Sequence, residues 1–129
     1  MIYGVGADIS KVARFEKWVK NPQMIARFFN NCEIVENQDE NKNLQFLCEH
    51  YAARFSAKEA FAKALGTGFS GLSLEDFGII KNDDGKPEFF FGKNTKKIID
   101  NRCGLNWNIK VSLSHEKEYA LAFAVIEVN

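Results

Sequence analysis

The stretch that decides the fold runs Arg54-Phe55-Ser56-Ala57-Lys58-Glu59-Ala60-Phe61-Ala62-Lys63-Ala64-Leu65-Gly66-Thr67-Gly68. It ends a helical pattern that begins near residue 41. Glu59 and Lys63 are four residues apart, so they are neighbours on the helix surface. Gly66 suits a helix end, and Gly68 favours a backbone that turns tightly or lets another group approach. The pair is either an ordinary ion pair worth about 0.2–0.5 kcal/mol or part of a site.

Two charged residues in this helix lie on or beside its apolar stripe. Glu59 lies at the border of the stripe, where a partly desolvated carboxylate is suited to hold a cation. Lys58 lies inside it, and a lysine there needs a carboxylate, a phosphate or a route to solvent. Both positions favour a site. The stripe consists of Leu44, Leu47, Tyr51, Phe55, Ala62 and Leu65.

Length and composition predict one domain over residues 1–129, of globular composition. Apolar residues make up 46% of the chain, charged residues 26%, and the net charge is zero. Zero net charge gives no bulk attraction to nucleic acid or membrane, and we expect neither as a partner. No apolar run approaches the ~20 residues of a membrane span. The three cysteines lack metal-site spacing and indicate reduced thiols in a cytoplasmic protein.

The first strand is expected over residues 1–7, with Asp8 at its end. Asp8 shares a strand face with Gly4 and Gly6, which carry no side chain. Two interpretations remain open for Asp8. It caps a following helix, or it is a ligand beside space that the glycines clear.

A basic segment follows, with helices expected over residues 10–20 and 23–30 around Asn21-Pro22. It is either a solvated face or a docking surface for an acidic partner. Trp18 favours docking, because interfaces use aromatic anchors near arginine. Between residues 9 and 30 the only acid is Glu16, and the basic residues are Lys11, Arg14, Lys17, Lys20 and Arg27.

The remaining pattern predicts strands and one short helix. Residues 33–40 read as an acidic connector, and residues 41–65 as the long helix. Asp84-Gly85 favours a hairpin of strands 77–81 and 88–91. A short helix is expected over 94–102 and a strand over 107–114. Residues 119–128 are apolar on both faces, which predicts the central strand of a sheet.

Asp8 and Glu59, on separate elements, form a candidate Mg²⁺ site. Mg²⁺ typically joins one or two carboxylates to substrate phosphates. Cations would hold the phosphates, because a helix C-terminus repels anions. The cations are Arg54, Lys58, Lys63 and His115, and the glycines that permit close approach are Gly66, Gly68 and Gly85.

Three motifs resemble those of the short, stand-alone holo-acyl-carrier-protein synthases, which are 4'-phosphopantetheinyl transferases. They stand in the family's order and cover almost the whole chain. They are Gly4-Val5-Gly6-Ala7-Asp8-Ile9 with Arg14, Arg54 to Phe61 with Lys63 to Gly68, and Ser112-Leu113-Ser114-His115 with Tyr119-Ala120.

The resemblance implies transfer of 4'-phosphopantetheine from coenzyme A to a serine of apo acyl carrier protein, in fatty acid biosynthesis, releasing adenosine 3',5'-bisphosphate. Asp8 and Glu59 would hold Mg²⁺ and, with Lys63, form the catalytic set. Lys63 and His115 would bind phosphates of coenzyme A. The coenzyme A contacts would also include Arg54, Lys58, Gly66, Gly68 and the loop Gly85-Lys86-Pro87.

The resemblance also implies an α+β fold, with a mainly antiparallel sheet against one long and several short helices. It implies a homotrimer with active sites between subunits. Arg14 would contact the carrier protein, together with Lys17, Trp18 and Arg27. Two alternatives remain: a non-catalytic trimer that docks an acidic protein, and a metal-dependent nucleotide hydrolase.

Overall fold

The computed structural model describes residues 1–36 and 43–129. The larger of its two sheets is antiparallel and has three strands. The strands lie in the order β1 (Ile2–Lys11), β5 (Tyr119–Val128) and β4 (Trp107–His115). A separate antiparallel hairpin pairs β2 (Phe77–Lys81) with β3 (Pro87–Phe91). The antiparallel arrangement and the central place of residues 119–128 confirm the predictions.

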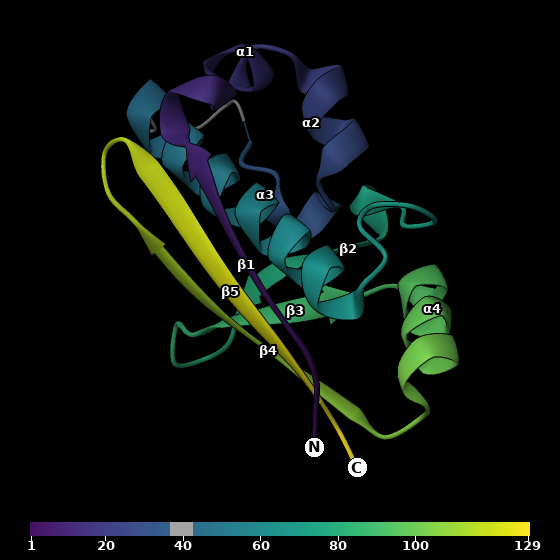
Figure 1. Ribbon diagram of the computed structural model, residues 1–129. Helices are drawn as coiled ribbons and strands as arrows, with labels where there is room; N and C mark the ends of the chain where they lie inside the picture. The colour runs from purple at the N-terminus through teal and green to yellow at the C-terminus, as the bar shows by residue number, and fades with distance from the viewer. Residues whose placement is uncertain (37–42) are drawn as a thin grey trace.

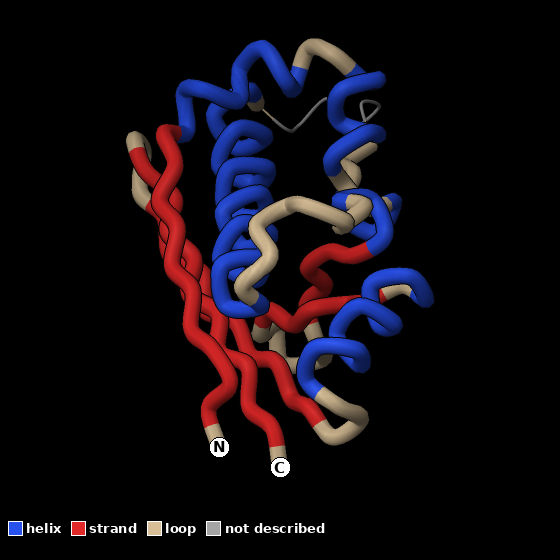
Figure 2. Tube along the Cα trace, turned by 45° about the vertical axis from the view of Figure 1, so that its right-hand side comes forward, coloured by secondary structure: helices blue, strands red, loops and turns tan. Residues whose placement is uncertain are grey.

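The long helix α3 (Leu44–Leu65) packs on one face of the sheet (Figure 1). Figure 2 shows the sheet nearly edge-on, with α3 against one face and no described helix against the other. Shorter elements surround the far side of α3, which confirms the predicted α+β class. They are η1 (Val12–Phe15), α1 (Glu16–Val19), α2 (Pro22–Phe28), η2 (Asn31–Glu33), η3 (Leu74–Asp76) and α4 (Lys93–Cys103).

The expected helix over residues 10–20 is wrong at its start. β1 continues through Ser10 and Lys11, whose partners on β5 are Ala120 and Tyr119. The Ser10 hydroxyl is buried and lies 2.6 Å from that of Ser56 on α3. Helical apolar spacing predicted a helix here, but pairing with the long strand β5 keeps the backbone extended. Asp8 therefore lies within β1 and caps no helix.

The two glycines of β1 let the helix backbone lie directly against the strand. A Cβ added at Gly4 would stand 2.0 Å from the carbonyl oxygen of Ala64, and one at Gly6 would stand 1.9 Å from that of Ala60. No side chain fits at such distances. The space that we expected Gly4 and Gly6 to clear for a ligand is thus filled by α3.

The far side of α3 packs against an aromatic core. Phe61 is fully buried and its ring lies 5.2 Å from Phe77 and 5.1 Å from Phe91, between ring centroids. These contacts join α3 to the β2–β3 hairpin. The helix is therefore held between the sheet on one side and the hairpin on the other.

The beginning of α3 differs slightly from the expected helix over 41–65. The helix starts at Leu44, and the side chain of Asn43 caps it by accepting from the Phe46 N–H at 2.7 Å. Residues 41 and 42, and Asp39 and Glu40 of the expected acidic connector, lie outside the described residues.

We predict that Gly6→Ala destabilises the protein by about 3 kcal/mol or more, because the new methyl group would collide with helix backbone. Gly71→Ala is the matched control. Gly71 has a φ of +80°, but a Cβ there would have nothing within 4 Å. Gly71→Ala should lower the free energy of unfolding by only about 1 kcal/mol, because alanine disfavours this backbone angle but meets no neighbouring atom. Urea unfolding measures both, and equal losses would contradict the packing of α3 on β1.

Candidate active site

Asp8, Glu59 and Lys63 meet beside β1, as the sequence predicted. The Lys63 ammonium donates to the carbonyl of Ala7 at 2.9 Å and lies 3.3 Å from Asp8 Oδ1. The Asp8 side chain is 11% exposed and that of Lys63 is 55% exposed. The group therefore lies at the protein surface, with the aspartate largely shielded and the lysine open to solvent.

The two carboxylates are close enough to share a proton. Burial raises the pKa of Glu59, and so do a hydrogen bond to Asp8 and the charge of Asp8. Lys63 and Arg14 act in the opposite direction. Two carboxylates held together in a partly buried place repel each other unless a proton or a cation lies between them.

The donor set fits Mg²⁺. Hard oxygen ligands from one or two carboxylates, completed by water and phosphate oxygens, are what Mg²⁺ binds in phosphate-handling sites. Within residues 1–36 and 43–129, no group of three or more His, Cys, Asp or Glu side chains is placed to hold a metal. Asp8 and Glu59 can thus supply two ligands, and a substrate would have to supply others.

Arg14, Trp18 and Arg27 come together on an aromatic platform beside this group. The Arg14 guanidinium lies 5.7 Å from the Trp18 ring and 5.4 Å from the Phe55 ring. Trp18 stacks on Phe28 at 5.0 Å, and Arg27 lies 5.7 Å over Phe28. Trp18 is partly buried by these contacts. The basic surface is therefore anchored on the core, and its Arg14 is near enough to Glu59 to lower the pKa of that carboxyl.

Lys17 is exposed on the same short helix, α1. In the described part of the chain it has neither an ion pair nor a side-chain hydrogen bond. The segment around it therefore presents positive charge to solvent, as the sequence predicted.

The assignment of Lys58 to coenzyme A is wrong. Its side chain is completely buried and its ammonium lies 2.8 Å from Glu33 Oε1. It also donates to the backbone carbonyls of Leu74 and Phe77. Of the three partners that the sequence left open for Lys58, a carboxylate, a phosphate or a route to solvent, the structure shows the carboxylate, that of Glu33. The sequence predicted that Glu33 belongs to the acidic connector over residues 33–40. In the structure it lies in η2 and is fully buried.

Arg54 retains binding capacity. Its Nη1 donates to the carbonyl of His50 at 3.2 Å. Its Nε is buried and, among the residues that the structure describes, has no hydrogen-bond partner. Burial lowers the pKa of Arg54, and the charge of Glu33 opposes this. A buried donor without an acceptor is costly, so an incoming anion would find a prepared donor here.

The Gly66–Gly68 turn ends α3 in the expected way. Gly66 has a φ of +88° and its N–H donates to Ala62 and Lys63 carbonyls at 3.0 and 3.2 Å. Gly68 has a φ of +58°, and a Cβ there would meet nothing within 4 Å. Gly68 is therefore needed for its backbone angle, and the space around it is open. The sequence did not indicate Arg102, whose Nε donates to the Leu65 carbonyl at 3.1 Å and so caps the helix end.

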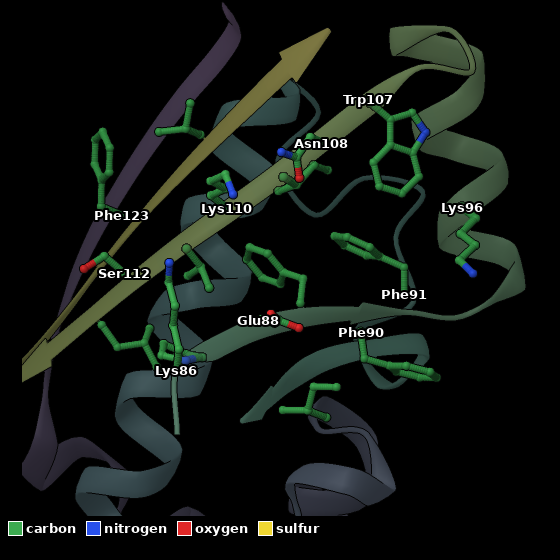
Figure 3. Close-up of a pocket in the computed structure, with 17 residues that line it drawn as sticks. Lys86, Glu88, Phe90, Phe91, Lys96, Trp107, Asn108, Lys110, Ser112 and Phe123 are labelled. Carbon is green, nitrogen blue, oxygen red and sulfur yellow. The ribbon is translucent and has the colours of Figure 1, made fainter. Parts of the chain in front are cut away.

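The hairpin turn contributes to a separate pocket of about 880 Å³. The pocket lies between β3 and β4, and Figure 3 shows Lys86 reaching from the turn toward β4, where Lys110 and Ser112 lie. Gly85, with a φ of +80°, forms the turn itself, and Pro87 also lines the pocket. Lys110 lies on the polar face that strand alternation predicts for residues 107–114, and no role was expected for it.

The structure does not bring this pocket to the carboxylates within one chain. Asp8 is on β1, Ser112 is on β4, and β5 lies between them. Two strand spacings separate the outer strands by roughly 10 Å. His115 is also on β4, and its Nδ1 lies 3.9 Å from Glu49 Oε1 on α3. The predicted coenzyme A residues thus form groups at opposite edges of one sheet.

No helix in the described part of the chain is long and apolar enough to cross a membrane. The expected cytoplasmic location stays a prediction.

Comparison with known proteins gives one consistent result. The sequence profile of the 4'-phosphopantetheinyl transferase superfamily matches residues 4–124. A holo-[acyl-carrier-protein] synthase of Treponema pallidum is 40% identical over 127 residues, covering 98% of this chain and 97% of that protein.

Two solved structures have the same fold. Holo-[acyl-carrier-protein] synthase from Neisseria meningitidis is 35% identical, with a TM-score of 0.80 over 98% of this chain and 99% of that one. The enzyme from Bacillus anthracis, in complex with CoA (3',5'-ADP), is 32% identical, with a TM-score of 0.78 over 100% and 99%.

We predict that Glu59→Gln stabilises the metal-free protein at pH 7. The raised pKa of Glu59 means that its charged form costs folding energy, a cost present at pH 7 and absent where Glu59 is protonated in both states. The gain should be under about 1 kcal/mol, because the group is partly exposed. It should vanish near pH 4.

Urea unfolding in EDTA at both pH values measures this gain. Glu75→Gln, which removes an exposed carboxylate on η3, is the control and should change nothing. A loss of stability in Glu59→Gln at pH 7 would contradict the inferred repulsion.

Proposed function

The chain belongs to the 4'-phosphopantetheinyl transferase superfamily, and from this membership we infer its reaction. It transfers 4'-phosphopantetheine from coenzyme A to a serine of apo acyl carrier protein. The products are holo carrier protein, which serves fatty acid biosynthesis, and adenosine 3',5'-bisphosphate. The match to holo-[acyl-carrier-protein] synthases along nearly the whole chain carries this conclusion.

We propose that Asp8 and Glu59 hold Mg²⁺ and that activity depends on it. The support is the pair of carboxylates that meet beside β1, one of them with a raised pKa. Bound there, Mg²⁺ would stabilise negative charge on the pyrophosphate oxygens of coenzyme A. Lys63 would leave Asp8 and donate to the same phosphate, because its side chain is long and more than half exposed.

Lys63 would stabilise the charge that develops during transfer. The serine hydroxyl oxygen of the carrier forms a bond to the β-phosphorus and gives up its proton to water, and the bond between that phosphorus and the oxygen of adenosine 3',5'-bisphosphate breaks. The phosphate oxygens carry the extra charge, and a fixed ammonium beside them lowers the barrier. The unpartnered Nε of Arg54 would serve a second phosphate of the same substrate.

The surface of Arg14, Lys17, Trp18 and Arg27 would dock the carrier protein. Its charges face solvent, and two of the three cations lie over aromatic rings, which keeps them in place. Arg14 is near enough to influence Glu59. A carrier bound on this surface would therefore present its serine beside the carboxylates.

We also propose a homotrimer in which each active site is shared by two subunits. The two groups of coenzyme A residues lie at opposite edges of the sheet, so one coenzyme A molecule would contact both most readily across an interface. The outer face of the sheet is apolar and exposed. It shows Val5 at 54%, Ile9 at 61%, Leu121 at 46% and Phe123 at 44% exposure.

Such an interface joins unlike edges, the β1 edge of one chain and the β4 edge of the next. Contacts of this kind form a closed ring when the rotation between subunits closes. In that ring, Lys86 and His115 of one chain would complete the site of Asp8, Glu59 and Lys63 on its neighbour. The hairpin pocket would then face the nucleotide end of coenzyme A.

We predict that Asp8→Ala and Glu59→Ala each abolish transfer, by a factor of about 10³ or more, while the fold is kept. Apo acyl carrier protein is incubated with the protein, coenzyme A and Mg²⁺, and its mass is measured. Wild type should add one phosphopantetheine group, and Glu75→Ala, which removes an exposed carboxylate on η3, should behave as wild type.

Three outcomes would argue against parts of this assignment. No added mass with folded wild type would refute the transferase. Full activity of both alanine variants would refute the proposed site. Cleavage of coenzyme A without carrier protein would indicate a hydrolase.

We predict that Leu121→Glu dissociates the assembly and abolishes transfer, because burial of an unpaired charge in an apolar interface is unfavourable. Light scattering should give the 14.7 kDa of one chain, against three times that mass for wild type. Lys97→Glu, which changes an exposed charge on α4, is the control. Wild type that is a fully active monomer would refute both the trimer and the shared site.

A further inference from the structure

The buried ion pair of Glu33 and Lys58 joins three elements that are far apart in sequence. The ammonium of Lys58 on α3 lies 2.8 Å from Glu33 Oε1 in η2, and both side chains have 0% exposure. Two apolar residues of similar volume often stabilise a core as well as such a pair does. Stability is thus a weak explanation for it, and the backbone groups that the pair holds suggest another.

Both partners contact backbone atoms around β2. Lys58 donates to the Leu74 carbonyl at 2.7 Å and to that of Phe77. Glu33 Oε2 accepts from the N–H of Ile79 at 3.1 Å. Backbone groups cannot rotate away as side chains can. The pair therefore fixes the rotation of α3 about its axis and the position of β2 at once.

The neighbouring strand leaves no room for another arrangement. A Cβ added at Gly78 would stand 2.5 Å from the carboxyl carbon of Glu33. The backbone of β2 thus lies directly on the carboxylate. Glu33 in turn accepts from the Asn30 N–H at 3.0 Å, which closes the short η2 turn around it.

Lys58 lies next to Glu59, the proposed metal ligand, in the sequence. Lys58 and Glu59 are separated by about 100° around the helix. A rotation of α3 that loosened Lys58 would therefore swing Glu59 relative to Asp8 on β1. On its other side the pair holds β2, which leads directly to the turn of Gly85, Lys86 and Pro87.

We propose that Glu33 and Lys58 are positioning residues of the transferase site. By fixing α3 against β2, they hold Glu59 at Asp8 and set the place of the hairpin turn that contacts coenzyme A. This inference rests on the proposed function. Neither residue touches a substrate, and both act through the elements they join.

The test replaces the pair by neutral residues of similar shape, Glu33→Gln with Lys58→Met. Two readouts are measured besides melting temperature: Mg²⁺ affinity by calorimetry without substrates, and kcat and KM for coenzyme A. We expect a lower melting temperature, because the Leu74 and Phe77 carbonyls lose their donor. The Mg²⁺ dissociation constant and the KM should each rise about tenfold, because small displacements of ligating groups are costly.

Ile99→Ala is the matched control for lost stability. Ile99 is fully buried on α4, an element that carries neither residue of the pair. It should lose about 2–5 kcal/mol of stability while Mg²⁺ affinity and KM stay within about twofold of wild type. A double variant whose Mg²⁺ affinity and KM equal those of wild type would overturn the proposal.

Two further results remain decisive. If the double variant does not fold, Glu33→Asp keeps both charges and withdraws the carboxylate by one methylene, and it should show a smaller rise in both constants. Unchanged constants there would also overturn the proposal. Absence of transfer by wild type would refute the proposed function instead, while Mg²⁺ affinity would still test the positioning.

Discussion

The contact of helix α3 with the bare backbone of β1 is the constraint on which the rest of this structure depends. At Gly4 and Gly6 the helix carbonyls occupy the positions that side chains would otherwise fill. This approach brings Glu59 within hydrogen-bonding reach of Asp8 and lets Lys63 reach the Ala7 carbonyl. With side chains at the two glycines, the helix would stand farther from the sheet and the carboxylates would separate.

The same helix separates the proposed site, on its side toward β1, from the packed interior on its side toward β2. Toward the β1 edge it presents Glu59, whose pKa is raised first by burial and then by the hydrogen bond to Asp8 and the charge of Asp8, an arrangement that costs stability and favours a cation. Toward β2 it presents Lys58, with Glu33 and two carbonyls as partners, and Phe61 in an aromatic cluster. The packing of α3 toward β2 holds the helix, and with it Glu59, in place.

A single chain does not contain the whole proposed site, and the sheet explains why. Its order β1-β5-β4 puts the carboxylates at one edge and the Lys86 pocket at the other. The apolar outer face between these edges is exposed in one chain. Assembly into a ring would cover that face and join the two edges, so that folding, association and substrate binding depend on one surface.

The sequence by itself determined the central strand and indicated the carboxylate pair, and the α+β class followed from its resemblance to a known family. Periodicity along the chain reports which side of an element is buried, and Glu59 with Lys63 four residues apart must share a helix face. It also indicated that Lys58 needs a carboxylate, a phosphate or a route to solvent. Only the tertiary structure decided that this partner is Glu33, because a contact across 25 positions leaves no periodic signal. It likewise decided that Gly4 and Gly6 admit a helix and no ligand, and that β1 extends past Ser10. Each of these three features depends on which distant segment packs against the residue, and the order of residues along the chain does not specify that segment.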